Sequence, residues 1–144
     1  MDELQKAAKI AFATEFSFYL KTHNYHWNVT GADFFEYHEL FGVIYQEVYG
    51  AIDDFAEKIR SLGTYVPASY TRFSVLTQIE DETEIPPQMA MVQQLIEDNQ
   101  KAIGMFKIVY DLAEANGEHG FSNFLAERMD AHKKHGWMLR SSVR

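Results

Sequence analysis

The sequence predicts an all-α fold, a four-helix bundle with one long crossover, and three observations support this prediction. Apolar residues recur at helical spacing through nearly all of the 144 residues. No useful length alternates with the period of two that marks a β-strand. Two links between the expected helices are short, whereas the third is long. The chain length is typical of one domain, which we place over residues 1–144.

The first two helices are defined by their apolar stripes. The first should run from Asp2 to about His26, and its stripe is Ala8, Phe12, Phe16, Tyr19, His23 and His26. The second has the clearest pattern, a heptad stripe with alternating spacings of four and three: Phe34, His38, Phe41, Tyr45, Val48, Ile52, Phe55, Ile59 and Leu62. Asp33 and Glu36 resemble a capping box at its start, and Gly63 suits the left-handed position after its end.

The last two helices lie in the second half of the chain. The third should begin at Pro87, a residue suited to a first helical turn, and run to Gly117. The fourth should cover about Phe121 to Arg140, with a stripe of Phe124, Arg128, Ala131, His135 and Met138.

The links between the helices predict the topology. Short links at 28–32 and 116–120 should make two antiparallel hairpins. The link 63–86 must instead travel the length of a helix of about 45 Å, as in a bundle with one long crossover. A short extra helix is expected in it near Phe73–Gln78.

Charge and composition exclude several classes of protein. The 13 Lys and Arg against 21 Asp and Glu give a net charge of −8, which argues against a general nucleic-acid binder. Residues 128–144 hold five bases and one acid, a net of +4. We interpret them as a basic last turn facing the negative end of the helix dipole, with a DNA-contacting tail as the alternative. The chain has no cysteine, so disulfides and thiolate metal sites are excluded.

Targeting signals are not expected. The longest uncharged stretch, Ile85 to Ile96, is too short to cross a bilayer. The N-terminus is acidic where a signal peptide needs basic residues, so we predict a cytoplasmic protein.

Spacing also excludes one kind of iron site. Bundles that hold two irons inside one chain use Glu-x-x-His motifs on inner helix faces. None of the six histidines here has a glutamate three residues before it. The pairs His23/His26 and His132/His135 raise the alternative of zinc, yet no further ligand is spaced to complete a tetrahedral site.

A carboxylate pair and two histidines remain as candidate metal ligands. Asp53 and Glu57 lie one helical turn apart and could hold a hard cation such as Fe(II). His38 precedes Asp53 by 15 residues, ~22 Å along a helix, and His26 lies farther away still. One chain therefore cannot bring all four to one metal, whereas an antiparallel second copy across a two-fold axis could do so twice. The alternatives are a solvated acidic face and hydrogen-bonded core histidines.

Four segments carry a resemblance to a known family. They are the stretch 19–31, which includes His26-Trp27-Asn28, then His38-Glu39-Leu40-Phe41 with Tyr45, then 52–63 around Asp53 and Glu57, and finally 132–140. Together they resemble the Dps family of starvation-induced mini-ferritins over essentially the whole chain.

The resemblance implies a ferritin-like fold and a hollow shell of twelve subunits. The shell would oxidise Fe(II), preferably with hydrogen peroxide, and store the ferric product as part of a stress response. By resemblance, Asp53 and Glu57 are iron ligands from one subunit and His26 is the principal ligand from the other. His38 would help to bind a second, weaker iron. Trp27 would lie next to the irons as an electron donor, or simply pack in the interface.

Three departures from the family pattern stand out. The acid that the family usually has four residues after the second histidine is Gly42 here, and Glu39 and Gln46 lack the family spacing. The region matching the family's iron pore offers Glu114, Glu118, His119, Asn123 and Glu127, with Asn where Asp is common. The N-terminus is short, with Lys6 and Lys9 behind two acids, so DNA binding should be weak or absent.

We therefore expect an iron-oxidising and iron-storing cage in which the second iron site is weakened by Gly42. The alternatives are a DNA-protecting or structural cage with little or no iron oxidation, and a carrier cage for another metal such as zinc.

Overall fold

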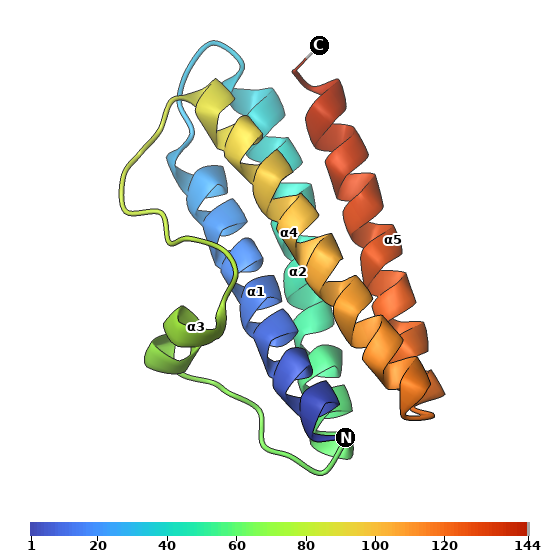
Figure 1. Ribbon diagram of the computed structural model, residues 1–144. Helices are drawn as coiled ribbons and strands as arrows, with labels where there is room; N and C mark the ends of the chain where they lie inside the picture. The colour runs from blue at the N-terminus through green and yellow to red at the C-terminus, as the bar shows by residue number, and fades with distance from the viewer. Residues whose placement is uncertain (144) are drawn as a thin grey trace.

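Four long helices and one short helix form the protein, as the computed structural model of residues 1–143 shows (Figure 1). They are α1 (Asp2–Asn28), α2 (Phe34–Ser61), α3 (Tyr70–Leu76), α4 (Gln88–Ala115) and α5 (His119–Ser141). Helices α1 and α2 form one antiparallel hairpin and α4 and α5 form the other. The segment between α2 and α4 returns along the bundle on the α1 side and contains α3 (Figure 1). The predicted all-α bundle with a long crossover is confirmed.

The helix boundaries agree with the predictions to within a few residues. The short helix begins at Tyr70, three residues before its predicted start, because the Ser69 side chain caps it by accepting a hydrogen bond from the Arg72 amide. Gly63 has the predicted left-handed conformation, with φ of 88°. The predicted capping box is wrong: Asp33 has φ −105° and ψ 37°, outside the extended region of such a cap, and its side chain makes no capping bond.

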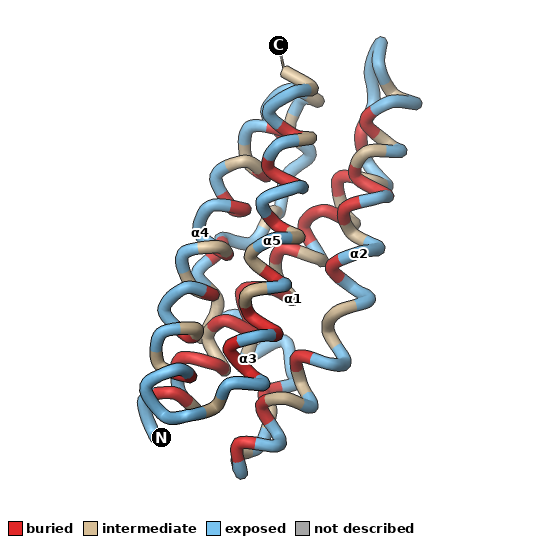
Figure 2. Tube along the Cα trace, turned by 90° about the vertical axis from the view of Figure 1, so that its right-hand side faces the viewer, coloured by how far each residue is buried: buried red, intermediate tan, exposed pale blue. Residues whose placement is uncertain are grey.

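The inner faces of the long helices carry the buried residues (Figure 2). On α2 the predicted stripe is correct at Phe41, Val48, Phe55, Ile59 and Leu62, which are buried. On α1 the buried face is rotated from the expected stripe and includes Leu4, Ala8, Ala11, Phe12, Glu15, Phe18, Thr22 and Tyr25. The other members of the expected stripe, Phe16, Tyr19, His23 and His26, are only half-buried. They form a second aromatic face that this chain leaves partly open.

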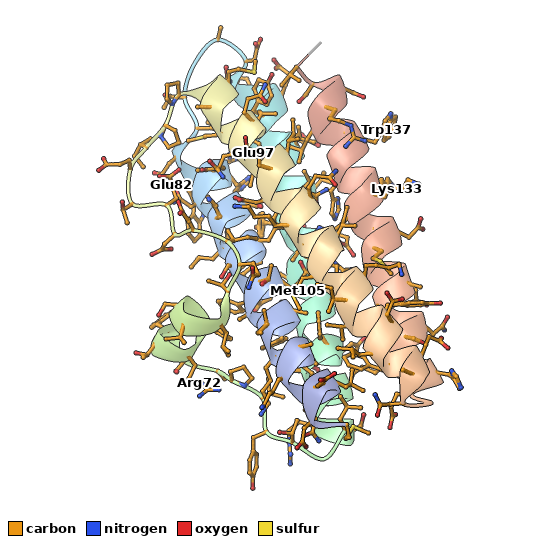
Figure 3. The ribbon with its side chains drawn as sticks, in the orientation of Figure 1. Arg72, Glu82, Glu97, Met105, Lys133 and Trp137 are labelled. Carbon is orange, nitrogen blue, oxygen red and sulfur yellow. The ribbon has the colours of Figure 1, made fainter. Side chains whose placement is uncertain are left out.

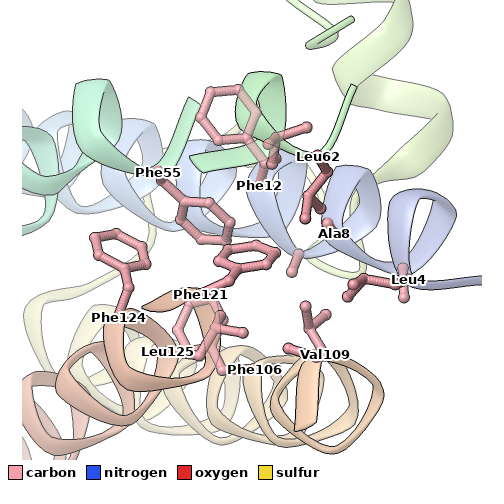
Figure 4. Close-up of a cluster of buried hydrophobic side chains, with 14 of the residues drawn as sticks. Leu4, Ala8, Phe12, Phe55, Leu62, Phe106, Val109, Phe121, Phe124 and Leu125 are labelled. Carbon is pink, nitrogen blue, oxygen red and sulfur yellow. The ribbon is translucent and has the colours of Figure 1, made fainter. Parts of the chain in front are cut away.

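Two apolar clusters make up the core. The cluster near the N-terminus gathers around Phe55, whose ring meets those of Phe12, Phe106, Phe121 and Phe124 at centroid distances of 5.4 to 6.2 Å (Figure 4). The other cluster includes Phe18, Tyr25, Phe41, Ile44, Leu95 and Leu139. Buried polar residues, among them Glu15, Asn99, Arg128 and His132, lie between the two clusters along α1, α4 and α5, and Glu47 of α2, 38% exposed, contacts them from the edge. We call this the polar layer.

Polar contacts from α1 hold the crossover. The Gln78 amide donates to Thr14 Oγ1 over 3.1 Å, and Lys21 Nζ donates to the Glu80 carbonyl over 2.9 Å. The Tyr25 hydroxyl donates to Glu82 over 2.6 Å. The crossover is therefore fixed against α1 rather than looped out from it.

The predicted basic last turn of α5 is largely wrong. Arg128 is buried in the polar layer, and Lys133 projects from the middle of α5 on the side away from the crossover (Figure 3). Of the basic residues, Arg140 is the one in the last turn, and Arg144 lies outside the described residues. Within residues 1–143 no helix is long and apolar enough to cross a membrane.

Candidate metal centre

The predicted carboxylate pair lies on the exposed face of α2. Phe55 and Ile59 point into the core, so Asp53 and Glu57 are exposed on the opposite side. Their carboxylate oxygens and one of Asp54 lie within 4.8 Å of one another. Within residues 1–143 this is the only group of three or more acidic or histidine side chains close enough to hold one ion. Sequence reasoning missed Asp54, although its spacing of three from Glu57 was a usable signal.

A hollow lies beside these carboxylates. It has a volume of about 400 Å³ and is lined by Asp54, Glu57, Lys58 and Ser61 of α2 and by Gly120, Asn123, Phe124 and Glu127 of α5. Asn123 and Glu127, two of the expected pore residues, therefore lie next to the carboxylate group. Glu114 is occupied at the α4–α5 turn, where it accepts a hydrogen bond from Ser122 over 2.6 Å and contacts His119.

The two predicted histidine ligands form a reciprocal pair. His26 Nδ1 lies 2.6 Å from the His38 carbonyl oxygen, and His38 Nδ1 lies 2.7 Å from the His26 carbonyl oxygen. A carbonyl only accepts hydrogen bonds, so each Nδ1 must be the donor. The rings stack with centroids 3.9 Å apart. Each Nε2 is left as a potential ligand, the arrangement that metal-binding histidines commonly have.

Gly42 packs against this pair. A Cβ atom built at position 42 would lie 3.1 Å from His26 Cε1 and 3.2 Å from His26 Nδ1, closer than ordinary packing. The missing side chain therefore makes room for the His26 ring. Gln46 lies beside this position, with its Nε2 4.0 Å from the same Cβ, and both Gln46 and Glu39 are exposed.

An aromatic stack leads away from the histidine pair. Trp27 is 62% exposed, and its ring packs against that of His23 with centroids 3.7 Å apart at a tilt of 32°. His23 in turn stacks on Tyr45 at 3.8 Å. Burial lowers the pKa of His23 and raises the pKa of Tyr19. The Tyr19 hydroxyl and His23 Nδ1 share a hydrogen bond of 3.1 Å. Trp27 thus lies close to the His26 ligand position and open to a partner.

The chain does not bring the four predicted ligands together. The group formed by Asp53, Asp54 and Glu57 contains neither His26 nor His38. The histidines lie at the α1–α2 turn and the carboxylates lie in the last third of α2. The four predicted ligands therefore lie in two separate groups on the same hairpin.

A second set of carboxylates and histidines lies in the polar layer, and of its members the sequence analysis singled out only the histidine pair. Arg128 binds Glu15 at 3.0 Å and Glu47 at 2.6 Å. His132 Nε2 donates to Glu15 over 2.7 Å, and His135 Nε2 donates to Glu47 over 2.7 Å. Residues at 15, 47 and 128–135 share no local motif, so only the folded bundle places them side by side.

These contacts shift the protonation of the polar layer. Burial alone would raise the pKa of the Glu15 carboxyl, but the charges and hydrogen bonds of His132 and Arg128 outweigh it and hold the pKa below its ordinary value. Burial would also raise the pKa of the Glu47 carboxyl, but hydrogen bonds from His135 and Arg128 outweigh it and hold the pKa well below the usual range. Burial lowers the pKa of His135 despite its contact with Glu47.

The fold defines a ferritin-like protein, and the model of the ferritin-like domain matches residues 5–144. The chain belongs to the Dps family within that class. It is 32% identical to the DNA protection during starvation protein of Brevibacillus brevis over 123 residues, which cover 85% of this chain and 83% of that protein. It is also 32% identical over 123 residues to general stress protein 20U of Bacillus subtilis, covering 85% of each.

Solved structures of the family share this fold. A Dps protein from Bacillus brevis superposes with a TM-score of 0.94 at 28% identity, covering 99% of this chain and 96% of that one. The Dps protein of Vibrio cholerae O1, described as a member of a broad superfamily of ferritin-like diiron-carboxylate proteins, superposes with a TM-score of 0.93 at 27% identity. It covers 99% of this chain and 90% of that one.

Proposed function

We propose that this protein oxidises Fe(II) at sites shared between two subunits and stores the ferric product inside a hollow shell of twelve chains. Membership of a diiron-carboxylate superfamily supports iron as the metal. The observation that carries the proposal is the pair of incomplete half-sites. Asp53 and Glu57 are exposed carboxylates, and His26 and His38 each have an Nε2 left for a ligand.

A two-fold axis completes both half-sites. If a second copy lies antiparallel across the α1–α2 face, its His26 and His38 reach Asp53 and Glu57 of the first copy. The operation is symmetric, so each dimer contains two sites. The half-buried aromatic face of α1 and the exposed Trp27 support this interface, because exposed apolar surface of this kind is typical of protein–protein interfaces.

Each residue has a distinct role at the proposed site. Asp53 and Glu57 supply hard anionic oxygens, which suit Fe(II), and His26 supplies a preoriented nitrogen. His38 would help to hold a second iron, which is bound weakly because Gly42 offers no carboxylate. Hydrogen peroxide accepts two electrons, so two Fe(II), one peroxide and two protons yield two Fe(III) and two waters. Trp27 would supply an electron when one iron is missing.

The test removes the two carboxylate charges and keeps the side-chain shape. The Asp53→Asn, Glu57→Gln double variant should still form shells on sizing chromatography. Its Fe(II) oxidation by peroxide should fall to the uncatalysed rate, because two hard ligands are gone. The matched control is Asp111→Asn, an exposed acid on α4 outside the half-sites. Oxidation that continues unchanged in the double variant would place the chemistry elsewhere. Zinc binding without iron oxidation by the wild type would favour a carrier cage.

We propose that DNA binding is weak or absent. Of the five bases in residues 128–144, Arg128 is neutralised inside the bundle, which reduces the basic surface of α5. Twelve chains at −8 each would carry −96 in total. Such a negative charge repels the phosphates of DNA. Electrostatic binding of a protein to these phosphates weakens further as the salt concentration rises. A gel shift with duplex DNA at about 150 mM salt, near physiological ionic strength, should show no stable complex. A retained complex would favour the DNA-protecting cage instead.

A further inference from the structure

A groove between α4 and α5 shares no residue with the carboxylate group of α2 or with the histidine pair. It has a volume of about 500 Å³, and its polar lining consists of Asn99 and Gln100 of α4 and Asp130, Lys133 and Arg140 of α5. Two of these five residues are cations and one is an acid, so the groove is locally positive in a chain whose net charge is −8. Such a groove is a candidate binding site for an anion.

A buried glycine lets two donors of this groove come together. A Cβ atom built at Gly136 would lie 2.9 Å from Arg140 Nη1 and 2.9 Å from Asn99 Nδ2, closer than side chains approach one another. Because Gly136 has no such atom, the Arg140 guanidinium lies against the helix backbone beside the Asn99 amide. A guanidinium and an amide N–H that converge on one place are suited to the oxygens of an anion.

The orientation of the Asn99 amide is fixed by the polar layer. Asn99 Nδ2 donates to the His132 carbonyl over 2.8 Å, and Asn99 Oδ1 lies 2.7 Å from His132 Nδ1. A carbonyl only accepts hydrogen bonds, so the nitrogen of the amide must be the atom that faces it. This bond uses one of the two N–H groups of Asn99, and the second remains for another acceptor.

The cations of the groove are not neutralised by an acid. Within residues 1–143, the ion pairs of lysine and arginine involve Lys21, Lys107 and Arg128 alone. Lys133 and Arg140 therefore face the groove without a paired carboxylate, although Asp130 lies in the same lining. Their charges are available to a ligand.

We propose that the α4–α5 groove binds one inorganic phosphate ion. Lys133 and Arg140 would balance its charge, and the Arg140 guanidinium and the Asn99 amide would donate to its oxygens. Asp130 would accept a hydrogen bond from its hydroxyl group.

Asp130 is the residue that favours phosphate over other oxoanions. A carboxylate repels an anion without a proton, but it accepts a hydrogen bond from an anion that keeps one. Inorganic phosphate keeps at least one proton at neutral pH, whereas sulfate and the phosphodiesters of DNA have none. A phosphomonoester has largely lost its last proton at pH 7, because its second pKa is about 6. The groove therefore fits the free ion best, and it is not suited to DNA.

The first test measures phosphate binding to the metal-free shell by calorimetry at pH 7 and constant ionic strength. The wild type should show saturable binding, and Arg140→Gln should weaken it about tenfold or more, as expected when a hydrogen bond to a charged group is lost. Lys133→Gln should also weaken it, whereas its exposed neighbour Lys134→Gln, outside the lining, should change it less than about twofold. Equal losses in the two lysine variants, or no saturable binding by the wild type, would overturn the proposal.

Gly136→Ala tests the geometry of the groove without changing any charge. The added Cβ would displace the Arg140 guanidinium and the Asn99 amide, so phosphate affinity should fall about as far as in Arg140→Gln. Circular dichroism checks that the variant is folded. A folded Gly136→Ala protein with wild-type affinity would overturn the proposal, and Arg140→Gln, an exposed substitution, tests the same donor without a change in packing.

The last test concerns the choice of anion. In the wild type, sulfate and glycerol phosphate should each bind about tenfold more weakly than inorganic phosphate, because neither donates a hydrogen bond to Asp130 at pH 7. Asp130→Asn should raise the affinity for sulfate and remove this preference. Binding of sulfate or of the ester to the wild type as tight as that of phosphate would overturn the proposal. None of these measurements involves iron, so their outcome is independent of the proposed iron oxidation.

Discussion

Acids and histidines occur in two regions of this chain, and their surroundings differ in one respect. In the polar layer Glu15 and Glu47 each accept hydrogen bonds from Arg128 and from a histidine. On the outer face of the hairpin, Asp53 and Glu57 accept none from a side chain within residues 1–143, and the two Nε2 atoms of His26 and His38 remain open. The same residue types therefore stabilise the bundle where they are paired and form a candidate metal centre where they are not.

The largest expected effect comes from unpairing the polar layer. Glu15→Gln keeps the side-chain shape but removes a buried carboxylate, so Arg128 keeps Glu47 alone and His132 Nε2 loses its charged acceptor. We expect a loss of about 3–5 kcal/mol in the free energy of unfolding. Denaturant titration at fixed protein concentration measures it, with the exposed Asp53→Asn as the control, expected within about 0.5 kcal/mol. An ordinary hydrogen bond contributes about 1 kcal/mol. A loss smaller than this for Glu15→Gln would mean that the Glu15 charge does not stabilise the polar layer.

Acid should weaken the same layer in two stages. The pKa of His135 is lowered by burial, so below pH of about 6.5 the unfolded chain binds a proton that the folded chain does not, and stability falls. The pKa values of Glu15 and Glu47 are held low, so a further loss begins below pH of about 4.3.

The variant His135→Gln tests whether His135 causes the loss of stability that begins below pH of about 6.5. The glutamine amide can still donate to Glu47, so the decline in unfolding free energy between pH 6.5 and 5 should become shallower in this variant. His23 contributes in the same direction, and it remains in both proteins. An equal decline in the variant and the wild type would exclude His135 as a source.

A smaller effect is expected at Gly42, which packs against the ring of the proposed ligand His26. Gly42→Ala would place a Cβ about 3 Å from the His26 ring, which must then shift. We expect the affinity for the first Fe(II) to fall roughly tenfold, as for other changes next to a ligand, while the shell stays intact. Anaerobic Fe(II) titration and sizing chromatography measure both quantities.

Gly42→Asp is the matched comparison, because it adds the same Cβ together with a carboxylate. A higher second-iron occupancy than in Gly42→Ala would identify position 42 as a lost ligand. Equal occupancy in the two variants would mean that Gly42 serves to accommodate His26.

The smallest effect is expected for an ion pair that belongs to neither region. Lys107 and Asp111 pair at 2.7 Å on α4, and both side chains are 59% exposed. Asp111→Asn should change the free energy of unfolding by no more than about 0.5 kcal/mol. A larger loss in the same denaturant titration would mean that exposure alone does not distinguish the two regions.

Local patterns predicted most of the fold. The four long helices follow from their helical periods, and the length of the 63–86 link indicated the crossover. The buried face of α1 was misassigned because Glu15 and Thr22, which are polar, lie inside, while Phe16 and Tyr19 lie partly outside. Polarity in the sequence does not tell whether a partner will satisfy a buried group.

The candidate site was predictable to the extent that it is local. Asp53 and Glu57 share one helix face, and this proximity follows from spacing alone. The bond between Glu15 and His132 joins residues 117 positions apart, so no window of sequence contains it. The orientation of the His26 and His38 rings depends on the path of the α1–α2 turn, which the spacing of the two residues does not specify.

The reciprocal bonds of His26 and His38 have a consequence for comparing relatives. Each imidazole ties the end of α1 to the start of α2, so selection for a stable hairpin would retain both histidines in a chain that no longer handles iron. Asp53 and Glu57 make no comparable structural contact, so they would be free to mutate in a relative that no longer oxidises iron. Among diverged cages, the exposed acids should therefore report the loss of iron oxidation sooner than the histidines do.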